Sequence, residues 1–489
     1  MKKRQSRREF LRGVGLAAVG SALAACAPQT VIVKETVEVE KEKVVTQVVE
    51  VEKEVTKIVA GTPVVEKVVE TKVVEKVVTA TPAPKETVTL SYATWMWPAR
   101  QKVVEESMRR FESLFPEVKV ELQGYPSSEY HDKIVTLVAG GAAPDTFHSW
   151  VDMTILFIES GLALDLQPYI ERDGYDEDNL ADCIDMARYE GHLYGFPRDG
   201  GAFGDVSVYY NINLLNKAGI PLPESDPQDP DKGWTWDDLL QMAKALTMDT
   251  NGDGKIDQWG VRHMGPLYEI CLHTWSNGGE ILNQDNTKCL MDMPETIEAI
   301  QWYADLTVKH HVSPLPDEIE GLGDVFMSGQ NAIYYAAVMY ANQLLDAGVE
   351  FDFAVAQLPR GKAGAINVAD THPIMIATST PNPDACWEWL KYTVSDENQR
   401  FQSLWAVAFP PQTKSIARSE DFTKYDGPPH DMSSFVYGET RMFPKTKHWR
   451  QAQREIIMPD LDPVFLGDAT AAEVIPGIVE KVDKLLAEG

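Results

Sequence analysis

The chain has 489 residues, of which 74 are acidic and 45 basic, giving a formal net charge of -29 at pH 7. Charge repulsion of this size argues against nucleic acid or an anionic lipid surface as a partner. Residues 87–489 are long enough to form two domains, each with a hydrophobic core.

The first 26 residues have the pattern of an export signal. They begin with basic side chains, continue as an apolar run from Val14 to Ala25, and reach Cys26 directly after Leu23-Ala24-Ala25. Such a segment is typical of a cleaved signal peptide and is too short to span a bilayer permanently. Residues 6–11 resemble a twin-arginine signal, and residues 23–26 resemble a lipobox. We therefore expect residues 1–25 to be removed and Cys26 to carry a lipid anchor at the outer face of the cell membrane.

Residues 26–86 form a segment of different composition. Residues 31–80 consist almost entirely of Val, Glu, Lys and Thr in near-repeats, and prolines follow at the end of the segment. Because it offers no residues for a packed core, the segment is interpreted as a stalk between the anchor and the globular part. A coiled coil is the alternative, although the valine pairs do not keep a heptad spacing.

The globular part begins with a β-α-β pattern. Residues 88–93 are typical of a strand, residues 101–115 of an amphipathic helix and residues 118–122 of a second strand, and a further helix is expected at 130–139. This alternation predicts parallel sheets flanked by helices, in which ligands bind at the carboxyl ends of the strands. Aromatic loops at 95–97, 148–150 and 194–199 are then expected on one face.

Four cysteines remain after Cys26 in a compartment that permits disulfides. The pair nearest in sequence is Cys271 and Cys289, which are the candidate disulfide, and four buried free thiols are the alternative.

Residues 249–257 resemble a calcium loop. Oxygen side chains stand at the first, third, fifth and ninth loop positions and glycine at the sixth, but the twelfth position is Gly260 instead of a bidentate glutamate. A structural calcium ion or a plain acidic turn without an ion both fit this pattern, and no cofactor is otherwise required. The candidate metal ligands are Asp249, Asn251, Asp253, Lys255 and Asp257.

A series of short motifs resembles one family across nearly all of residues 87–489. The motifs are Gly-Gly-x-x-Pro-Asp at 140–145, Gly-x-x-Tyr-Gly-x-Pro at 191–197, Tyr-Tyr-Asn at 209–211, Trp-Thr-Trp-Asp-Asp-Leu at 234–239, Gly-Gly-Glu-Ile-Leu at 278–282, Phe-Met-Ser-Gly-Gln at 326–330 and Trp-Glu-Trp-Leu-Lys-Tyr at 387–392. In content and order they resemble the carbohydrate-binding branch of the extracellular solute-binding proteins of ABC importers, which includes the maltose-binding proteins.

The resemblance implies an α/β fold of two lobes, each a mainly parallel sheet flanked by helices, that close on a ligand about crossing hinge strands. We expect residues 87–198 and 331–383 in the first lobe, and residues 199–330 and 384–489 in the second. Chain crossings are expected at 197–206 and at 329–332. The implied function is capture of a mono- or oligosaccharide and its delivery to the permease subunits of an ABC importer, by a monomer without enzymatic activity.

A sugar offers an apolar face that stacks on an indole and a rim of hydroxyl groups that bind carboxylates and amides. The best stacking candidates are Trp95, Trp150 and Trp275, while Asp145 is expected to cap a turn. The full set of expected ligand-binding residues is Trp95, Trp97, Trp150, Asp199, Trp275, Asn277, Tyr340, His372 and Trp405, with Arg198 as a further polar candidate.

Other ligand classes and activities remain open. The acidic composition is compatible with a peptide or a polyamine, and the adjacent tyrosines at 209–210 and 334–335 are compatible with a captured metal. A glycosidase would need two carboxylates on opposite sides of a bond, and such a pair is not recognisable from sequence. The chain carries no Gly-x-Ser-x-Gly elbow, zinc motif or phosphate loop.

Overall fold

The computed structural model describes residues 43–59, 62–78, 87–224, 226, 229, 232–405 and 410–488. The chain divides into two compact units, Met1–Lys85 and Glu86–Gly489. The expected signal peptide and Cys26 lie outside the described residues. Among the residues that are described, no helix has the length and apolar character needed to cross a membrane.

The described part of the first unit is a β-hairpin. Strands β1 (Lys43–Val59) and β2 (Thr62–Val78) pair antiparallel along their whole length, from Lys43 opposite Val78 to Val59 opposite Thr62. Valine and threonine are β-branched and therefore favour this extended backbone. The coiled-coil alternative is wrong for these two segments, and the two halves of the expected stalk pair with each other instead of forming a single unpaired linker.

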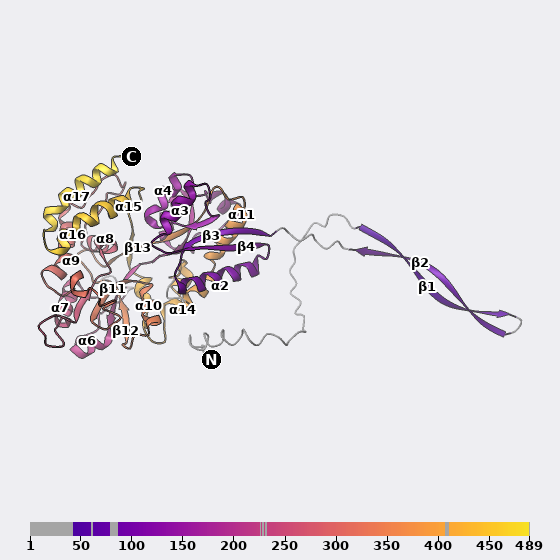
Figure 1. The fold of residues 1–489 in the computed structure, drawn as a ribbon, viewed down its shortest axis with the longest axis horizontal. Helices are drawn as coiled ribbons and strands as arrows, with labels where there is room; N and C mark the ends of the chain where they lie inside the picture. The colour runs from indigo at the N-terminus through magenta and orange to yellow at the C-terminus, as the bar shows by residue number, and fades with distance from the viewer. Residues whose placement is uncertain are drawn as a thin grey trace. The chain divides into compact units, whose positions relative to one another are not determined.

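The second unit contains a five-stranded sheet that defines its first lobe (Figure 1). The strand order is β4-β3-β5-β14-β8, with β3 parallel to both of its neighbours and β14 antiparallel to both of its own. Its strands are β3 (Val88–Trp95), β4 (Val118–Tyr125), β5 (Thr146–His148), β8 (Gly195–Asp199) and β14 (His372–Ile376).

Helices cover both faces of this sheet. Trp387 and Trp389 on α11 are fully buried in one hydrophobic core with Tyr92 of β3 and Phe196 of β8. The elements around the sheet are α2 (Pro98–Leu114), α3 (Tyr130–Ala139), α4 (Val151–Glu159), α5 (Gln167–Asp173), η1 (Asp182–Ala187), β6 (Arg188–Tyr189), β7 (His192–Leu193), α11 (Pro383–Thr393) and α12 (Asp396–Trp405).

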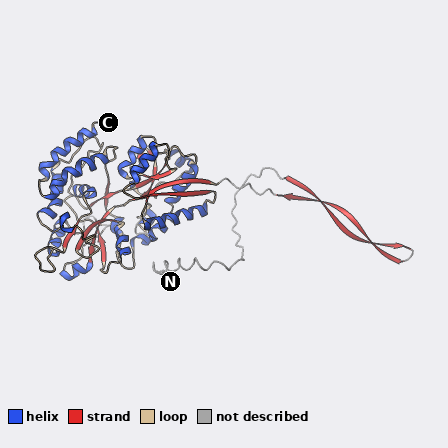
Figure 2. Ribbon diagram, in the orientation of Figure 1, coloured by secondary structure: helices blue, strands red, loops and turns tan. Residues whose placement is uncertain are grey.

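A four-stranded sheet with the order β10-β11-β9-β12 defines the second lobe, and Figure 2 shows the helices packed around it. Strand β9 is antiparallel to both neighbours, whereas β10 and β11 are parallel. A short parallel pair, β13 with β15, lies beside this sheet in the fold. The strands are β9 (Val206–Asn211), β10 (Trp259–Arg262), β11 (Asn331–Ala337), β12 (Phe353–Ala356), β13 (Ile366–Ala369) and β15 (Glu439–Met442).

Helices α9, α16 and α17 pack against one another over the second lobe (Figure 1). The capping box of Thr470 and Glu473 begins α17, and α8, α9 and α17 share the largest hydrophobic core. The helices and turns of this lobe are α6 (Ile212–Ala218), α7 (Trp236–Leu246), α8 (Pro266–Ser276), α9 (Pro294–Val308), η2 (Pro316–Ile319), α10 (Tyr340–Ala347), α13 (Lys414–Ala417), α14 (Glu420–Thr423), η3 (Ser433–Phe435), α15 (Trp449–Gln451), the π-helix η4 (Ala452–Ile457), α16 (Met458–Leu466) and α17 (Ala471–Leu486).

The strand pairings correct the expected lobe boundaries after residue 330. Strands β11 and β12 pair with β9 and so place residues 331–356 in the second lobe, while only β14 of the 331–383 range lies in the first sheet. Helix α11 packs on β3, β8 and β14, and α12 packs on α2 and α11, so both helices belong to the first lobe and not to the second. Sequence patterns mark a strand but not its pairing partner, and long-range pairing decides the lobe.

The chain crosses between the sheets from β8 to β9 and from β13 to β14, and it passes between the lobes again from α12 to α13. The first crossing lies within residues 197–206, as expected, whereas residues 329–332 lead into β11 of the same sheet and are not a crossing. The two crossing segments are joined by backbone hydrogen bonds, from Asp205 N to Val368 O (2.8 Å) and from Asp370 N to Gly201 O (3.2 Å). A Cβ atom on Gly200, whose φ is +98°, would lie 2.7 Å from the Asp370 carbonyl oxygen, which explains the glycine there.

Candidate functional site

A cavity of about 270 Å³ lies between the two lobes, next to the crossings. Its lining combines residues at the ends of first-lobe strands with residues of the second-lobe helices and loops. The lining residues are Trp95, Arg100, Ser127, Trp150, Asp199, Gly200, Asp205, Met264, Tyr268, Ala337, Val338, Met339, Asp370, His372, Phe443, Trp449, Gln453 and Arg454.

The first lobe contributes an aromatic wall of Trp95, Trp150 and His372. Trp95 is the last residue of β3, Trp150 precedes α4 and His372 begins β14, so adjacent strands of the sheet bring the three rings together. The Trp95 ring centroid lies 5.2 Å from that of His372 and 6.0 Å from that of Trp150, both in edge-to-face arrangements. Such contacts fix the orientation of the rings.

The second lobe contributes a facing aromatic wall of Tyr268, Phe443 and Trp449. The Phe443 ring centroid is 5.3 Å from that of Tyr268 and 6.0 Å from that of Trp449. Tyr268 lies in the first turn of α8, and Trp449 begins α15. The cavity therefore has aromatic surfaces on both sides.

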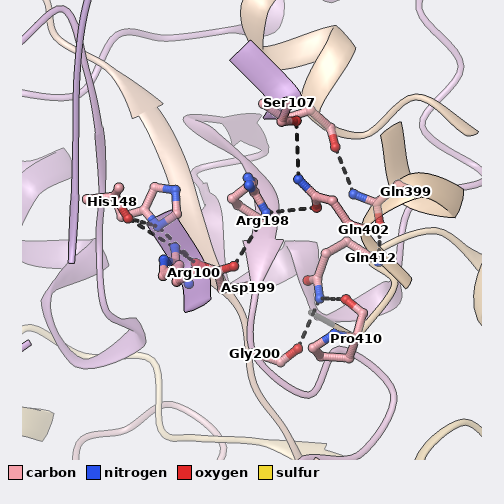
Figure 3. A network of polar contacts seen from close by, with 12 residues as sticks. Arg100, Ser107, His148, Arg198, Asp199, Gly200, Gln399, Gln402, Pro410 and Gln412 are labelled. Atoms are coloured by element: carbon pink, nitrogen blue, oxygen red, sulfur yellow. Dashed lines mark hydrogen bonds and ion pairs between the residues drawn. The ribbon is translucent and has the colours of Figure 1, made fainter. Parts of the chain in front are cut away.

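Asp199 lies at the cavity and joins a buried polar network (Figure 3). Its Oδ2 atom accepts from the Arg100 guanidinium and from Nδ1 of His148 (3.1 Å), and its Oδ1 atom accepts from Nη1 of Arg198 (3.4 Å). Arg198 also donates to Oε1 of Gln402 on α12 (3.0 Å). The network joins β8 to α2, β5 and α12, and one carboxylate is shared by two buried guanidinium groups.

The electrostatics of this network fix one protonation state. Burial alone would raise the pKa of Asp199, but the Arg100 guanidinium and the His148 hydrogen bond hold that pKa well below its usual value. Burial lowers the pKa of His148 to about 3, so its neutral ring accepts from the Tyr92 hydroxyl at Nε2 (2.7 Å) while Nδ1 donates to Asp199. Asp199 is therefore ionised and His148 neutral at neutral pH.

Two further carboxyl groups line the cavity from the crossings. Asp370 is fully buried, and its Oδ2 atom accepts from the Tyr268 hydroxyl (2.9 Å) and lies 3.4 Å from Nε2 of His372. Burial raises the pKa of Asp205 to about 6, against a hydrogen bond from the Gly201 backbone that lowers it. These groups supply hydrogen-bond acceptors beside the aromatic walls.

Four of the expected ligand-binding residues meet at this cavity: Trp95, Trp150, Asp199 and His372. Trp97 lies nearby, with its ring centroid 5.3 Å from Cζ of Arg100, but it does not line the cavity. The sequence pointed to these residues because each lies at or just after the end of a strand or at the start of one, and their binding of ligand stays a prediction.

Three other expected ligand-binding residues lie away from this cavity. Trp275 is buried in the second-lobe core and borders a different cavity of about 490 Å³. Asn277 is buried and donates to the Glu295 carbonyl (2.7 Å), and Tyr340 is buried with its hydroxyl donating to Asp324 (2.8 Å). The side chain of Trp405 lies outside the described residues.

Two polar candidates have structural partners. Arg198 is held by Asp199 and Gln402 in the network and does not line the cavity. The Asp145 carboxylate accepts from the backbone N–H (2.8 Å) and the hydroxyl (2.7 Å) of Ser91, so it joins its turn to β3 and does not cap the turn as expected.

The segment 249–257 forms an acidic turn that satisfies its own amides. The Asp249 carboxylate accepts from the backbone N–H groups of Gly252 (2.6 Å) and Gly254 (2.7 Å), and the Asp257 carboxylate accepts from the N–H and hydroxyl of Thr250. Within the described ranges, no group of three or more His, Cys, Asp or Glu side chains is arranged to hold a metal ion. These hydrogen bonds account for the turn without an ion, and calcium binding at this segment stays a prediction.

Cys271 and Cys289 are both buried and free, as are Cys183 and Cys386. The expected disulfide is therefore wrong, and the alternative of four buried thiols is the arrangement found. Burial raises the pKa of Cys289 to about 11, which keeps this thiol protonated and unreactive at neutral pH.

The second-lobe side of the cavity was not anticipated from sequence. Tyr268, Phe443, Trp449, Gln453 and Arg454 come from α8, the loop after β15, and α15 with η4. No single motif contains them, and only the packing of α8 beside β13, and of β13 beside β15, brings these segments together. A search for aromatic residues near proline or glycine would have marked Tyr268 and Phe443 but not Trp449.

Comparison with known proteins gives consistent matches. A family model described as bacterial extracellular solute-binding protein matches residues 93–400. An ABC substrate-binding protein of Listeria monocytogenes, solved in complex with cycloalternan, is similar with a TM-score of 0.71 and 24% identity, covering 82% of this chain and 100% of that one.

Two further matches agree in extent. A solute-binding protein of an ABC transporter from Thermotoga lettingae, bound with α-D-tagatose, gives a TM-score of 0.67 at 21% identity and covers 82% of this chain and 100% of its own. A putative binding protein of Brucella abortus is 23% identical over 393 residues, which are 78% of this chain and 89% of the relative. The likeness to the solved structures shows the fold.

Proposed function

The chain belongs to the family of bacterial extracellular solute-binding proteins, and on this premise we propose that it captures a sugar and delivers it to an ABC importer. The proposal draws on similar structures whose bound molecules are carbohydrates, namely cycloalternan and α-D-tagatose. The sugar binds between the lobes, and the permease subunits accept it from the closed form.

The observation that carries the proposal is the pair of facing aromatic walls. Trp95 and Trp150 line the cavity from one lobe, while Tyr268 and Trp449 line it from the other. A pyranose or furanose ring has two faces of C–H groups, and aromatic surfaces on both sides can stack against both of them. Hydroxyl groups at the rim of the sugar require polar partners, which Asp370, His372 and Gln453 supply.

Closure of the two lobes completes the site in this proposal. Neither wall alone encloses a ligand, because half of the lining residues belong to each lobe or its crossing segments. The crossings at 199–206 and 369–372 are the hinge about which the lobes rotate. A ligand that contacts both walls shifts the lobes toward the closed arrangement by its differential affinity for that state.

A cationic solute such as a polyamine is the second candidate. It is favoured by the buried carboxyl groups of Asp205 and Asp370, which line the same cavity. Such a ligand would place its ammonium groups against these carboxylates and its methylene chain on the aromatic walls.

The same proposal places the protein at the outer face of the cell membrane, on the basis of its N-terminal segment. Cys26 carries a lipid after removal of residues 1–25 and holds the protein at the outer face of the cell membrane. The stalk segment 26–86 separates the anchor from the binding unit, which acts as a monomer without catalysing a reaction.

A thermal-shift and calorimetric screen of residues 87–489 tests the function. The probes are D-tagatose, maltose, maltotriose, arabino-oligosaccharides, spermidine and putrescine. A ligand at 100 times its dissociation constant stabilises the fold by about 2.7 kcal/mol. Binding of one of the sugars supports the proposal. Binding of spermidine or putrescine with no response to any sugar replaces it by the cationic candidate.

A further inference from the structure

A segment of the second lobe reaches the first lobe beside the cavity. We call residues 445–454 the clasp. Nζ of Lys445 donates to the backbone carbonyl of Asp185 in η1 (2.7 Å), and Nζ of Lys447 lies 3.6 Å from Oε2 of Glu159 at the end of α4. Both contacts join different lobes and involve no ligand.

The clasp also contacts Trp150 of the aromatic wall. Cζ of Arg450 lies 5.9 Å and Cζ of Arg454 lies 5.6 Å from the centroid of the Trp150 ring, distances at which a guanidinium is attracted to the indole. The ring of His131 approaches the same indole with centroids 3.9 Å apart. Trp150 is therefore held between its own lobe and two cations of the other lobe.

The backbone of the clasp has an uncommon form. It runs from α15 directly into the π-helix η4, which contains Gln453 and Arg454, and both of these residues line the cavity. A π-helix is rare and is found mostly at functional sites, because the wider turn changes the direction in which side chains point. The same short segment thus supplies both ligand-facing side chains and contacts between the lobes.

We propose that the clasp is a positioning element which draws the lobes together and fixes the Trp150 indole before ligand arrives, so that part of the closed state is formed by protein contacts alone. The benefit of this closure for ligand capture rests on the proposed function. The closure of the lobes without ligand does not depend on which solute binds.

The clasp contacts act on the equilibrium between open and closed lobes. The Lys447 and Glu159 side chains are about one-third exposed, so their ion pair is screened by salt. An exposed pair of this kind changes an equilibrium constant by about 1.4- to fivefold. Because the apparent affinity is the intrinsic affinity multiplied by the closed fraction, loss of the clasp weakens binding without removing a ligand contact.

The test measures closure in the absence of any ligand. Spin labels are placed on residues 87–489 at Glu171→Cys in the first lobe and Glu480→Cys in the second, which are two exposed positions. This part of the chain excludes Cys26, and its four native thiols are buried. Pulsed electron paramagnetic resonance then gives the distribution of distances between the lobes. The variants are Lys447→Met, Arg450→Met and the cation-retaining Arg450→Lys. The matched control is Lys481→Met, whose ion pair with Asp460 (2.6 Å) lies within the second lobe.

We expect the unmodified chain to populate a short-distance state that Lys447→Met and Arg450→Met reduce, by about 1.4- to fivefold for Lys447→Met. Arg450→Lys and Lys481→Met should retain it. Raising the NaCl concentration from about 0.05 to about 0.5 M should reduce this state in the unmodified chain and leave Lys447→Met unchanged.

Identical distance distributions for the unmodified chain and the Lys447→Met and Arg450→Met variants would overturn the inference. An equal change in Lys481→Met would also overturn it. If no sugar binds but the clasp variants still open the protein, the proposed function fails while the inference stands.

Discussion

The guanidinium of Arg100 and the carboxylate of Asp199 form a buried ion pair at the point where β8 ends and the first crossing begins. Arg100 lies in the first turn of α2, directly after the loop that carries Trp97, and its Cζ atom is 5.0 Å from the ring centroid of Trp95. One pair therefore links the hinge of the molecule to the aromatic wall of its cavity.

Removal of the Asp199 charge should destabilise the first lobe. Asp199→Asn leaves the Arg100 guanidinium buried without its counter-ion, a change that typically costs about 3–5 kcal/mol in the free energy of unfolding. Chemical denaturation followed by circular dichroism measures this. The control is Asp384→Asn, whose partner Arg172 is half exposed, and its midpoint should not change. Equal midpoints for Asp199→Asn and the unmodified chain would contradict the prediction.

Trp150 and Trp275 should respond to substitution in opposite ways. Trp150 lines the cavity and is half-buried, so Trp150→Ala should weaken binding of the sugar found in the screen by about 1–3 kcal/mol and alter stability little. Trp275 is buried in the second-lobe core, so Trp275→Ala should lower the free energy of unfolding by about 3–5 kcal/mol with a normal dissociation constant. Calorimetry and thermal melting separate the two outcomes, and the reverse pattern would move the site to Trp275.

Stability should rise with pH between about 4.5 and 6.5. Burial lowers the pKa of four histidines to about 3, so these side chains stay neutral in the folded chain. In the unfolded chain the same histidines take up a proton below about pH 6.5. Stability from these groups is present above pH 6.5 and is lost as the pH falls toward 3. The four residues are His131, His148, His263 and His273.

Two carboxyl groups oppose this trend. Burial raises the pKa of Glu269 to about 8 and that of Asp205 to about 6, so each contributes stability below its unfolded pKa and loses it as the pH rises through the folded value. The histidines outnumber the two carboxyl groups, and the net slope is positive. Urea denaturation at pH 4.5, 5.5 and 6.5 checks the sign, and a midpoint that falls with pH would contradict it.

Chelation should leave the melting temperature unchanged. The Asp249 and Asp257 carboxylates are satisfied by the amides and hydroxyl of their own loop, so removal of calcium takes away no bond that the turn needs. Scanning calorimetry with EDTA and with added calcium measures this. A lower melting temperature with EDTA, abolished in Asp253→Ala, would instead establish the calcium loop.

Cys26→Ser should release the exported protein from the membrane fraction. The lipid on Cys26 is the expected anchor, and the described residues contain no helix suited to span a bilayer. Fractionation of cells that express each form shows the difference on an immunoblot. Membrane association that persists in the variant would remove the lipobox interpretation.

The order of motifs predicted the two-lobed fold, and the ends of strands predicted four of the residues that line the cavity. Trp95 and Trp150 could be placed because parallel strands bring their carboxyl ends to one edge. The burial of Trp275 could not be predicted, because it depends on which face of α8 packs on β13. A tryptophan at a helix end has the same local sequence whether it is core or cleft.

The predicted lobe boundaries were wrong for a related reason. β11 and α11 have clear local patterns, yet the sheet that each one joins is decided by contacts more than 100 residues away in sequence, such as Ile333 opposite Tyr210. The π-helix and the clasp could not be predicted from sequence either, because no residue in 445–457 indicates i→i+5 hydrogen bonding. Local preference determines the element, and tertiary packing determines its neighbours.

The hydrogen bonds between the two crossing segments limit the motions that the lobes have available. A translation of one lobe past the other would break the bonds from Asp205 to Val368 and from Asp370 to Gly201, whereas a rotation about the crossings leaves both intact. A Cβ atom on Gly200 would lie 2.7 Å from the carbonyl oxygen of Asp370, so the two segments are also in close steric contact. The two bonded crossing segments therefore favour an angular movement of the lobes over a sliding one.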